Sequence, residues 1–398
     1  MDLFKKCEDY TRIEDLKAID LYPYFHQLTS GQDTVVQMEG KRTIMIGSNN
    51  YLGLTSNKEV IKAGVEALEK YGSGCSGSRF LNGTLDSHVM LEKELAEFLH
   101  KEACVTFSTG FQSNLGIISC IAGRNDVIIS DKENHASIYD GCKLSYARLL
   151  RYEHNDMEDL ERQLASVGED KGILIVTDGV FSMSGEICKL PEIVKLARKY
   201  GARVMVDDAH GLGVIGEGGR GTASYYNLEN EVDIIMGTFS KSLASLGGYC
   251  ACSERVANYI RHNSRPFIFS ASITPASVAC ARKSLEILKR EPERVKRLEE
   301  NGNYFREGLT KRGVKFIPGN APIVAIWTYT DENSFKACKM LMEKGVYVNP
   351  VISPAVPVGQ SILRTSFTAT HTKEQLDEAM DKIEEVIKEL LKDDKVHQ

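Results

Sequence analysis

The alternation of short apolar runs with amphipathic stretches constrains the fold of this chain more than any other feature. From about residue 100, runs rich in β-branched and aromatic residues are separated by segments with helical spacing, such as residues 157–167 and 190–200. The apolar runs are ACVTFSTG, DVIISD, RLLRY, GILIVTDGV, ARVMVDDAH, VDIIMG and GGYCAC. This alternation is typical of βαβ units, in which helices cover both faces of a largely parallel sheet.

Changes in the pattern of apolar and polar residues along the chain predict three parts. Residues 1–48 form an N-terminal segment that ends in the strand-like run RTIMIGS, and residues 49–285 form a large domain with the alternating pattern. Residues 286–398 form a smaller α+β domain that closes with a helix over residues 373–392. We expect the N-terminal segment to pack with the smaller domain or to bridge the two domains.

Composition and charge argue against several classes of function. Acidic and basic residues are interspersed and give a net charge of −6, so nothing favours nucleic acid as a partner. The longest apolar runs are far shorter than the roughly 20 residues of a membrane-spanning helix, and the N-terminus lacks a signal-peptide pattern. We therefore expect a cytoplasmic protein. The ten cysteines form no CxxC pair, which favours free thiols over disulfides or a metal site.

The residues that follow the predicted strands form a polar set that the intervening helices do not share. They are Gly110, Phe111, Asn134, His135, Phe181, Ser182, Asp207, Asp208, His210, Thr238, Ser240 and Lys241. Because ligands of parallel sheets bind outside the carboxyl ends of the strands, we expect these residues to lie at a binding site. Each has an ordinary explanation by itself: a helix cap, a packed histidine or a solvated lysine. Their occurrence at successive strand ends favours a shared ligand.

Pyridoxal phosphate (PLP) is a cofactor that would use the acid, the two histidines, the phosphate-type turns and the lysine of this set. It needs a lysine amine for a Schiff base, an acid beside the pyridine nitrogen, a cradle for the phosphate and a flat group over the ring. Lys241 stands between small residues in GTFSKSLASLGGY, and Asp207 follows an apolar run that places it where an unpaired carboxylate is costly. Ser108, Thr109 and Gly110 are expected to open a helix whose free amides suit a phosphate.

A dinucleotide-binding fingerprint also occurs and points to a different cofactor. Gly211, Gly213 and Gly216 match the spacing GxGxxG after a predicted strand. That motif requires a helix at the glycines, whereas the following residues EGGRG favour a loop. Binding of a nicotinamide or flavin cofactor is therefore the weaker alternative.

Seven motifs give the chain a resemblance to a known family. They are SNNYLGL, GSRFLNGT, NHASIYDG, TDGVFSMSG, VDDAHGLGVIGEGGRG, GTFSKS and LRTSFTATHT. The chain resembles the α-oxoamine synthases, which are fold-type I PLP enzymes, from about Leu21 to its last helix. The resemblance implies an α/β fold of the aspartate-aminotransferase type, with PLP bound to the large domain at residues 49–285 and a smaller C-terminal α+β domain.

The resemblance also implies the catalytic residues around the cofactor ring. Lys241 would form the Schiff base and act as the base, and Asp207 would pair with the pyridine nitrogen. His210 would pair with the ring hydroxyl. His135 would stack on the face of the ring and contact the substrate.

Further residues would hold the phosphate, the substrate and the neighbouring subunit. The phosphate would be held by Gly110, Phe111, Thr238 and Ser240, with Ser182 nearby. Arg364 would face the amino-acid carboxylate, and Asn50 would lie close to the substrate. Because sites of this family form between two subunits, we expect a homodimer in which Phe269 and Ser270 reach into the neighbour's pocket.

Members of this family join an amino acid to an acyl-CoA and release carbon dioxide. The whole-chain pattern, including NPVISPAVP before Arg364, is most similar to members that condense L-serine with a long-chain acyl-CoA, palmitoyl-CoA, to 3-oxosphinganine. The alternatives are a glycine C-acetyltransferase, an 8-amino-7-oxononanoate synthase and a non-catalytic scaffold homologue. The filled catalytic positions argue against the scaffold. Because the product is a lipid base, the lysines of the last helix could serve a peripheral membrane contact, although a solvated helical face explains them better.

Overall fold

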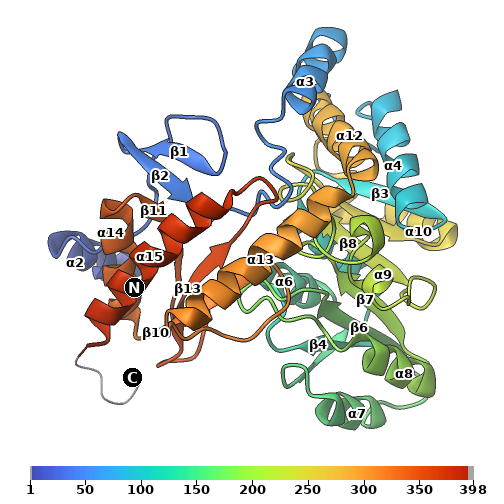
Figure 1. Ribbon diagram of the computed structural model, residues 1–398. Helices are drawn as coiled ribbons and strands as arrows, with labels where there is room; N and C mark the ends of the chain where they lie inside the picture. Colours follow the sequence, from blue (N-terminus) through green and yellow to red (C-terminus); the bar gives the residue numbers. More distant parts are fainter. Residues whose placement is uncertain (1, 393–398) are drawn as a thin grey trace.

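The computed structural model describes residues 2–392 and is built around a seven-stranded sheet (Figure 1). In the spatial order β3-β9-β8-β7-β6-β4-β5, its strands are β3 (Ala103–Phe107), β9 (Gly248–Cys252), β8 (Ile234–Thr238), β7 (Arg203–Asp207), β6 (Gly172–Asp178), β4 (Asp126–Asp131) and β5 (Arg148–Tyr152). Neighbouring strands are parallel, except that β9 is antiparallel to β3 and β8. The seven predicted strands and the mostly parallel sheet are confirmed.

Helices cover both faces of this sheet, because side chains of each buried strand alternate between two apolar clusters. Ile175 packs in one cluster, whereas Leu174 and Val176 pack in the other. The first face is covered by α4 (Asp86–Phe98), α7 (Met157–Ala165), α8 (Leu190–Tyr200) and α12 (Pro275–Arg290), and α12 packs on α3 (Lys58–Tyr71). The second face is covered by α5 (Gly110–Ile121), α6 (Ala136–Leu144), α10 (Glu254–Asn263) and α11 (Arg265–Ile268).

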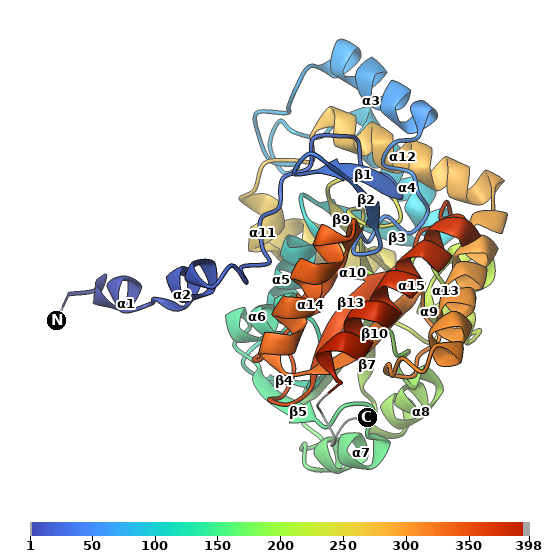
Figure 2. The same ribbon diagram turned by 60° about the vertical axis from the view of Figure 1, so that its left-hand side comes forward.

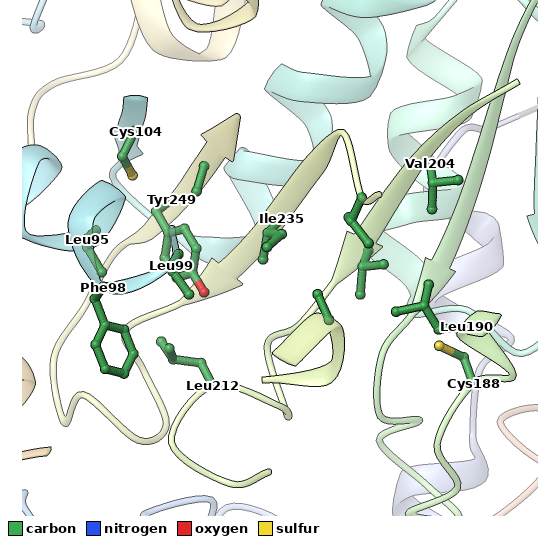
Figure 3. Packing of buried hydrophobic residues seen from close by; sticks show 14 of the residues in the cluster. Leu95, Phe98, Leu99, Cys104, Cys188, Leu190, Val204, Leu212, Ile235 and Tyr249 are labelled. Atoms are coloured by element: carbon green, nitrogen blue, oxygen red, sulfur yellow. The ribbon is translucent and has the colours of Figure 1, made fainter. Parts of the chain in front are cut away.

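The core of the first face lies against the strands whose carboxyl ends carry the predicted polar residues. Figure 3 shows Val204, Ile235 and Tyr249 on the strands, with Leu190 of α8 at one side and Leu99 beside α4 at the other. These five side chains are at most 1% exposed. Fully burying a side chain of this size contributes about 1.5–3 kcal/mol each, so the strands form a rigid support for the residues at their ends.

Within the described residues, the smaller domain has three helices and, together with the N-terminal segment, forms two three-stranded sheets. One sheet joins β1 (Val35–Met38), β2 (Lys41–Met45) and β11 (Val346–Tyr347), and the other joins β10 (Ile323–Tyr329), β13 (Ser361–Ser366) and β12 (Asn349–Val351). The helices are α13 (Glu293–Lys311), α14 (Asp331–Glu343) and α15 (Lys373–Leu390). Because β2 pairs with β11, the prediction that the N-terminal segment packs with the smaller domain is confirmed. The division after residue 285 falls inside α12 and stays a prediction.

The first residues form an arm that extends from the body of the molecule (Figure 2). Its helices α1 (Lys5–Glu8) and α2 (Arg12–Ala18) contain no buried residue. Two ion pairs connect the arm to α14: Arg12 with Asp331 at 3.2 Å, and Asp20 with Lys339 at 2.6 Å. None of the helices within residues 2–392 is long and apolar enough to cross a membrane.

The dinucleotide fingerprint does not open an α-helix. Gly216 has φ 79°, and the chain continues into the 3₁₀ turn η1 (Glu217–Gly219) and the short helix α9 (Thr222–Tyr225). The prediction of a loop after the glycines is therefore confirmed. The ten cysteines are all free thiols, and six of them are buried.

Candidate active site

A cavity of about 240 Å³ lies at the carboxyl ends of β6, β7 and β8, beside the start of α5. Eight of the predicted site residues line it: Gly110, Phe111, His135, Asp207, His210, Thr238, Ser240 and Lys241. The sheet thus brings together residues from the ends of four separate strands. Five predicted residues lie outside the lining, namely Asn50, Ser182, Phe269, Ser270 and Arg364.

Lys241 follows β8 in a tight turn that directs it into the cavity. The turn is closed by hydrogen bonds from the Ala244 amide to the Lys241 carbonyl (3.1 Å) and from the Phe239 amide to the Gly247 carbonyl (2.9 Å). Desolvation lowers the pKa of the Lys241 amine to about 8, although the Asp207 carboxylate opposes the shift. The amine has no hydrogen-bond partner among the described residues, so it is free to react with a ligand.

Asp207 ends β7 as a buried carboxylate, 4% exposed. Its Oδ2 accepts a hydrogen bond from Asn114 Nδ2 (2.6 Å), and its Oδ1 accepts one from the Ala209 amide (3.0 Å). No lysine, arginine or histidine in residues 2–392 forms an ion pair with it. A buried carboxylate without a cation is costly, so this position suits a ligand that brings a protonated nitrogen.

The start of α5 and the end of β8 form a cradle for an anion. Thr109 caps α5 by accepting from the Gln112 amide (3.1 Å), whereas the amides of Gly110 and Phe111 have no partner in the described part of the chain. Thr238 Oγ1 lies 2.9 Å from Ser240 Oγ. Thr238 Oγ1 donates to the Gly247 carbonyl (3.0 Å), so the Ser240 hydroxyl is the one that can reach an anion. Free amides at a helix N-terminus are typical of phosphate sites.

Gly110 allows α5 to approach the end of β8 closely enough to form this cradle. A Cβ atom at this position would lie 2.7 Å from Thr238 Oγ1 and 2.8 Å from Thr238 Cβ. No side chain fits between the two elements without moving them apart, so glycine is required for the helix to approach β8.

His135 caps α6 and lines the cavity. Its Nδ1 accepts from the Ser137 amide (3.3 Å) and lies 2.7 Å from Ser137 Oγ, so Nε2 carries the ring proton and can donate it to a ligand. Desolvation lowers the pKa of His135, although Asp207 opposes the shift. The backbone amide of His135 donates to Asp178 (3.1 Å), whose pKa is raised by burial and by the nearby Asp207 charge.

His210 lies in the wall beside Asp207 and is bonded to a residue of the N-terminal region. Its Nδ1 is 2.7 Å from the hydroxyl of Tyr51, which is fully buried. Burial and the nearby Lys241 charge lower the pKa of His210 well below its ordinary value, so the ring is neutral. Its Nε2 has no partner among the residues described and remains available to a ligand.

Arg364 joins the smaller domain to the candidate site. This residue of β13 is 6% exposed, and its Nε donates to the Ser182 carbonyl at 2.5 Å. Its Nη2 donates to Asn49 Oδ1 at 3.0 Å. The side chain of Asn50, in contrast, is used within its own turn, where Oδ1 accepts from the Leu54 amide (3.0 Å). The residue that meets Arg364 is therefore Asn49.

Phe269 and Ser270 follow α11 on the outer surface near the start of α5. The Phe269 side chain is 75% exposed, and Ser270 Oγ accepts from Gln112 Nε2 at 3.0 Å. They therefore lie beside the anion cradle but outside their own cavity. Their predicted role in a neighbouring subunit stays a prediction.

The residues of the cavity fit PLP. The unpaired amine of Lys241 matches the aldehyde, the buried Asp207 matches a protonated pyridine nitrogen, and the cradle at Gly110 matches the phosphate. No group of three or more histidine, cysteine, aspartate or glutamate side chains within residues 2–392 could hold a metal ion.

Comparison with known proteins identifies the family. The family described as aminotransferase class I and II matches residues 41–383. The chain belongs to this family. It is 52% identical over 387 residues to a serine palmitoyltransferase of Sphingobacterium spiritivorum, covering 97% of both chains. It is 42% identical over 380 residues to an 8-amino-7-oxononanoate synthase of Thermoanaerobacter pseudethanolicus, covering 95% of this chain and 96% of that relative.

A solved structure also resembles the fold of this chain closely. It is a serine palmitoyltransferase variant from S. paucimobilis with a bound PLP–myriocin aldimine. The TM-score is 0.95 at 36% identity, and the match covers 98% of this chain and 99% of that one. The predicted fold-type I architecture of PLP-dependent transferases is therefore confirmed.

Several residues of the site do not stand out in the sequence of this family member. Asn114 lies within α5 and reaches Asp207, and Asp178 ends β6 beneath His135. Tyr51 and Asn49 come from the motif SNNYLGL, which drew attention to Asn50 alone. The strand-end rule covers Asp178, whereas no local pattern reveals Asn114, because its role depends on how α5 packs on β7.

Proposed function

We propose that this protein catalyses the PLP-dependent decarboxylative condensation of L-serine with a long-chain acyl-CoA, releasing CoA and CO₂ and giving a 3-oxosphinganine. The observation that carries the proposal is the lysine amine of pKa about 8 in one cavity with a buried, unpaired Asp207. The serine palmitoyltransferase relative at 52% identity supports serine and palmitoyl-CoA as substrates.

Residues of this chain would hold the cofactor by three of its groups. Lys241 would bind the aldehyde, Asp207 the pyridine nitrogen, and the amides at Gly110 and Phe111 the phosphate, together with the Ser240 hydroxyl. Bound PLP supplies an electron sink for the charge that forms at the amino-acid Cα. Asp207 would keep the pyridine nitrogen protonated, because its buried carboxylate forms no ion pair within residues 2–392.

Lys241 and His135 would handle the protons of the reaction. With a pKa of about 8, the Nζ of Lys241 is partly neutral near pH 7 and can accept the Cα proton of serine. Positioned bases of this kind typically contribute about 10²–10⁴-fold to a rate. The Nε2–H of His135 is free to donate to the acyl oxygen as negative charge develops there.

Arg364 would bind the carboxylate of serine. Its guanidinium is oriented by two acceptors, the Ser182 carbonyl and Asn49 Oδ1, and a planar guanidinium suits a carboxylate. The two acceptors come from different parts of the chain, so Arg364 is presented in a single direction.

The active form would be a cytoplasmic homodimer with the active site at the subunit interface. Support comes from the exposed Phe269, and from Ser270 beside the anion cradle, which a second copy could cover.

Steady-state assays of serine, glycine and alanine against acyl-CoA esters of increasing length test this proposal. We expect turnover with serine and a long-chain ester, together with a 3-oxosphinganine product identified by mass spectrometry. Turnover only with glycine and acetyl-CoA would instead identify a glycine C-acetyltransferase. Turnover only with alanine and a shorter ester would favour an 8-amino-7-oxononanoate synthase, which the 42% identical relative represents.

A further inference from the structure

A second charged cluster lies outside the cavity, at the neighbouring strand ends. His154 follows β5, and its Nδ1 lies 3.0 Å from Asp131 Oδ1 at the end of β4. Its Nε2 lies 3.2 Å from Glu186 and 3.7 Å from Glu133. Asp131 is 0% exposed and also accepts from the Asn155 amide (3.0 Å), so one side of the cluster is anchored in the sheet.

The other side of the cluster holds the turn that follows β6. The Phe181 amide donates to the Glu186 carbonyl (2.9 Å), and the Gly185 amide donates to the Phe181 carbonyl (2.9 Å). The ring of the buried Phe181 meets the His154 imidazole edge to face, with centroids 4.3 Å apart. His154 therefore contacts both ends of the turn from Phe181 to Glu186.

The charges around His154 keep its ring protonated. Desolvation lowers the pKa of His154, but hydrogen bonds to Asp131 and Glu186 raise it to about 10. The contact with His154 in turn lowers the pKa of Glu186. The ion pairs therefore persist across the neutral pH range.

This turn is also the part of the large domain that holds Arg364. Ser182, the second residue of the turn, provides the carbonyl that accepts from Arg364 Nε at 2.5 Å. We propose that His154 is a positioning residue: by joining Asp131 on the sheet to Glu186 on the turn, it fixes the Ser182 carbonyl and so the direction of Arg364. This inference rests on the proposed function, in which Arg364 binds the carboxylate of serine.

The geometry explains why the turn from Phe181 to Glu186 must be held in one position. The turn also contacts the smaller domain, where a Cβ on Gly185 would lie 2.9 Å from the Ile323 carbonyl. A shift of the turn toward the sheet or toward the smaller domain would reorient the Ser182 carbonyl, which accepts from Arg364. Because a misplacement of about 1 Å can cost on the order of 10²-fold in rate, a rigid turn matters for substrate orientation.

The experiment compares His154→Gln with the wild-type holoenzyme by two measurements. The first is steady-state kinetics with serine, for which we expect KM to rise about tenfold while kcat changes less than about threefold. The second is hydrogen–deuterium exchange, for which we expect faster exchange of the Phe181 and Gly185 amides. If His154→Gln fails to fold, Glu186→Gln serves as the second variant, because it is a milder change at a more exposed residue. It should also raise the KM for serine and speed the exchange of the two amides.

His100→Gln is the matched control, because His100 pairs with Glu229 at 3.2 Å on the surface, away from the turn. It should leave both measurements unchanged. An unaltered KM for serine, or unaltered exchange at Phe181 and Gly185, in both His154→Gln and Glu186→Gln would overturn the inference. If the wild-type protein does not turn over serine, the proposed function is wrong, whereas the exchange data still decide whether His154 holds the turn.

Discussion

The amine of Lys241 lies in a wall of the cavity where desolvation favours its neutral form. With a pKa of about 8, about one-tenth of the amine is neutral at pH 7, far more than for an ordinary lysine. The neutral amine is the form that attacks an aldehyde and accepts a proton. The environment of this one residue therefore prepares it for both tasks.

Cofactor uptake by the protein freed of PLP should follow the titration of Lys241. Because only the neutral amine reacts, the rate of uptake should rise about tenfold per pH unit below pH 8 and level off above it. Stopped-flow absorbance after addition of PLP measures this rate. A rate that stays constant between pH 6 and pH 9 would contradict the assignment, and Lys241→Ala should show no adduct that borohydride can fix.

Asp207→Asn should lower the exchange of the serine Cα proton by about 10²-fold or more. An amide cannot hold a proton on the pyridine nitrogen, and its NH₂ group would face either Asn114 Nδ2 or the Ala209 amide, both of which are donors. Proton exchange in D₂O, followed by NMR, measures the effect.

The neighbouring Asp208 gives the control for that change. It is also buried, but it binds the Thr222 amide (2.7 Å) and hydroxyl (2.6 Å) instead of lining the cavity. Asp208→Asn should therefore leave the exchange rate within about threefold of wild type while lowering stability. An equal loss of Cα proton exchange in Asp207→Asn and Asp208→Asn would show that Asp207 acts only through folding.

At the level of elements, the site depends on the close approach of α5 to β8. The strand ends in Thr238, and the helix begins at Gly110, which allows the two to meet without a side chain between them. The free amides of the helix then lie beside the hydroxyls of the strand end. The anion cradle is thus a property of two packed elements, and neither element provides it separately.

Gly110→Ala should weaken PLP binding by about tenfold or more. The new Cβ would meet Thr238 at 2.7 Å and push the helix away from the strand, which separates the two halves of the cradle. Gly123→Ala, just beyond the other end of α5, is the control, because its Cβ would meet no atom closer than 3.7 Å. Equilibrium titration with PLP compares them, and equal affinities would refute the role of Gly110.

At the level of the whole molecule, the site is assembled from three parts of the chain. The body of the large domain provides Lys241 and Asp207, its N-terminal end provides Asn49 and Tyr51, and the smaller domain provides Arg364. Tyr51 packs in the apolar cluster of the smaller domain while its hydroxyl meets His210. The relative placement of the two domains therefore sets the position of the substrate groups.

A mixture of two inactive variants should regain activity if the dimer proposal is right. Lys241→Ala removes the reactive amine, and Phe269→Ala removes the side chain proposed to enter the neighbouring pocket. In a mixed dimer, one site keeps both residues, so refolded equimolar mixtures should recover about one-quarter of wild-type activity. Recovery near zero, with mixed dimers verified by mass spectrometry, would contradict a contribution of Phe269 to the neighbouring site.

Local sequence patterns predicted the elements and the residues that follow the strands. Seven apolar runs became the seven strands of the large sheet, and the helix predicted over residues 190–200 was found with the same bounds. Strand ends gather at one edge by the geometry of parallel sheets, so Asp207, His210 and Lys241 could be placed together before the structure was known.

The sequence by itself thus determined the fold class, the cofactor chemistry and half of the cavity lining, because these follow from periodicity and from residue types at strand ends. Only the tertiary structure decided that Asn49 meets Arg364, that Asn114 donates to Asp207, and that His154 pairs with Glu186. These contacts join residues far apart in the chain. Their existence depends on how helices pack and domains dock, which periodicity does not encode.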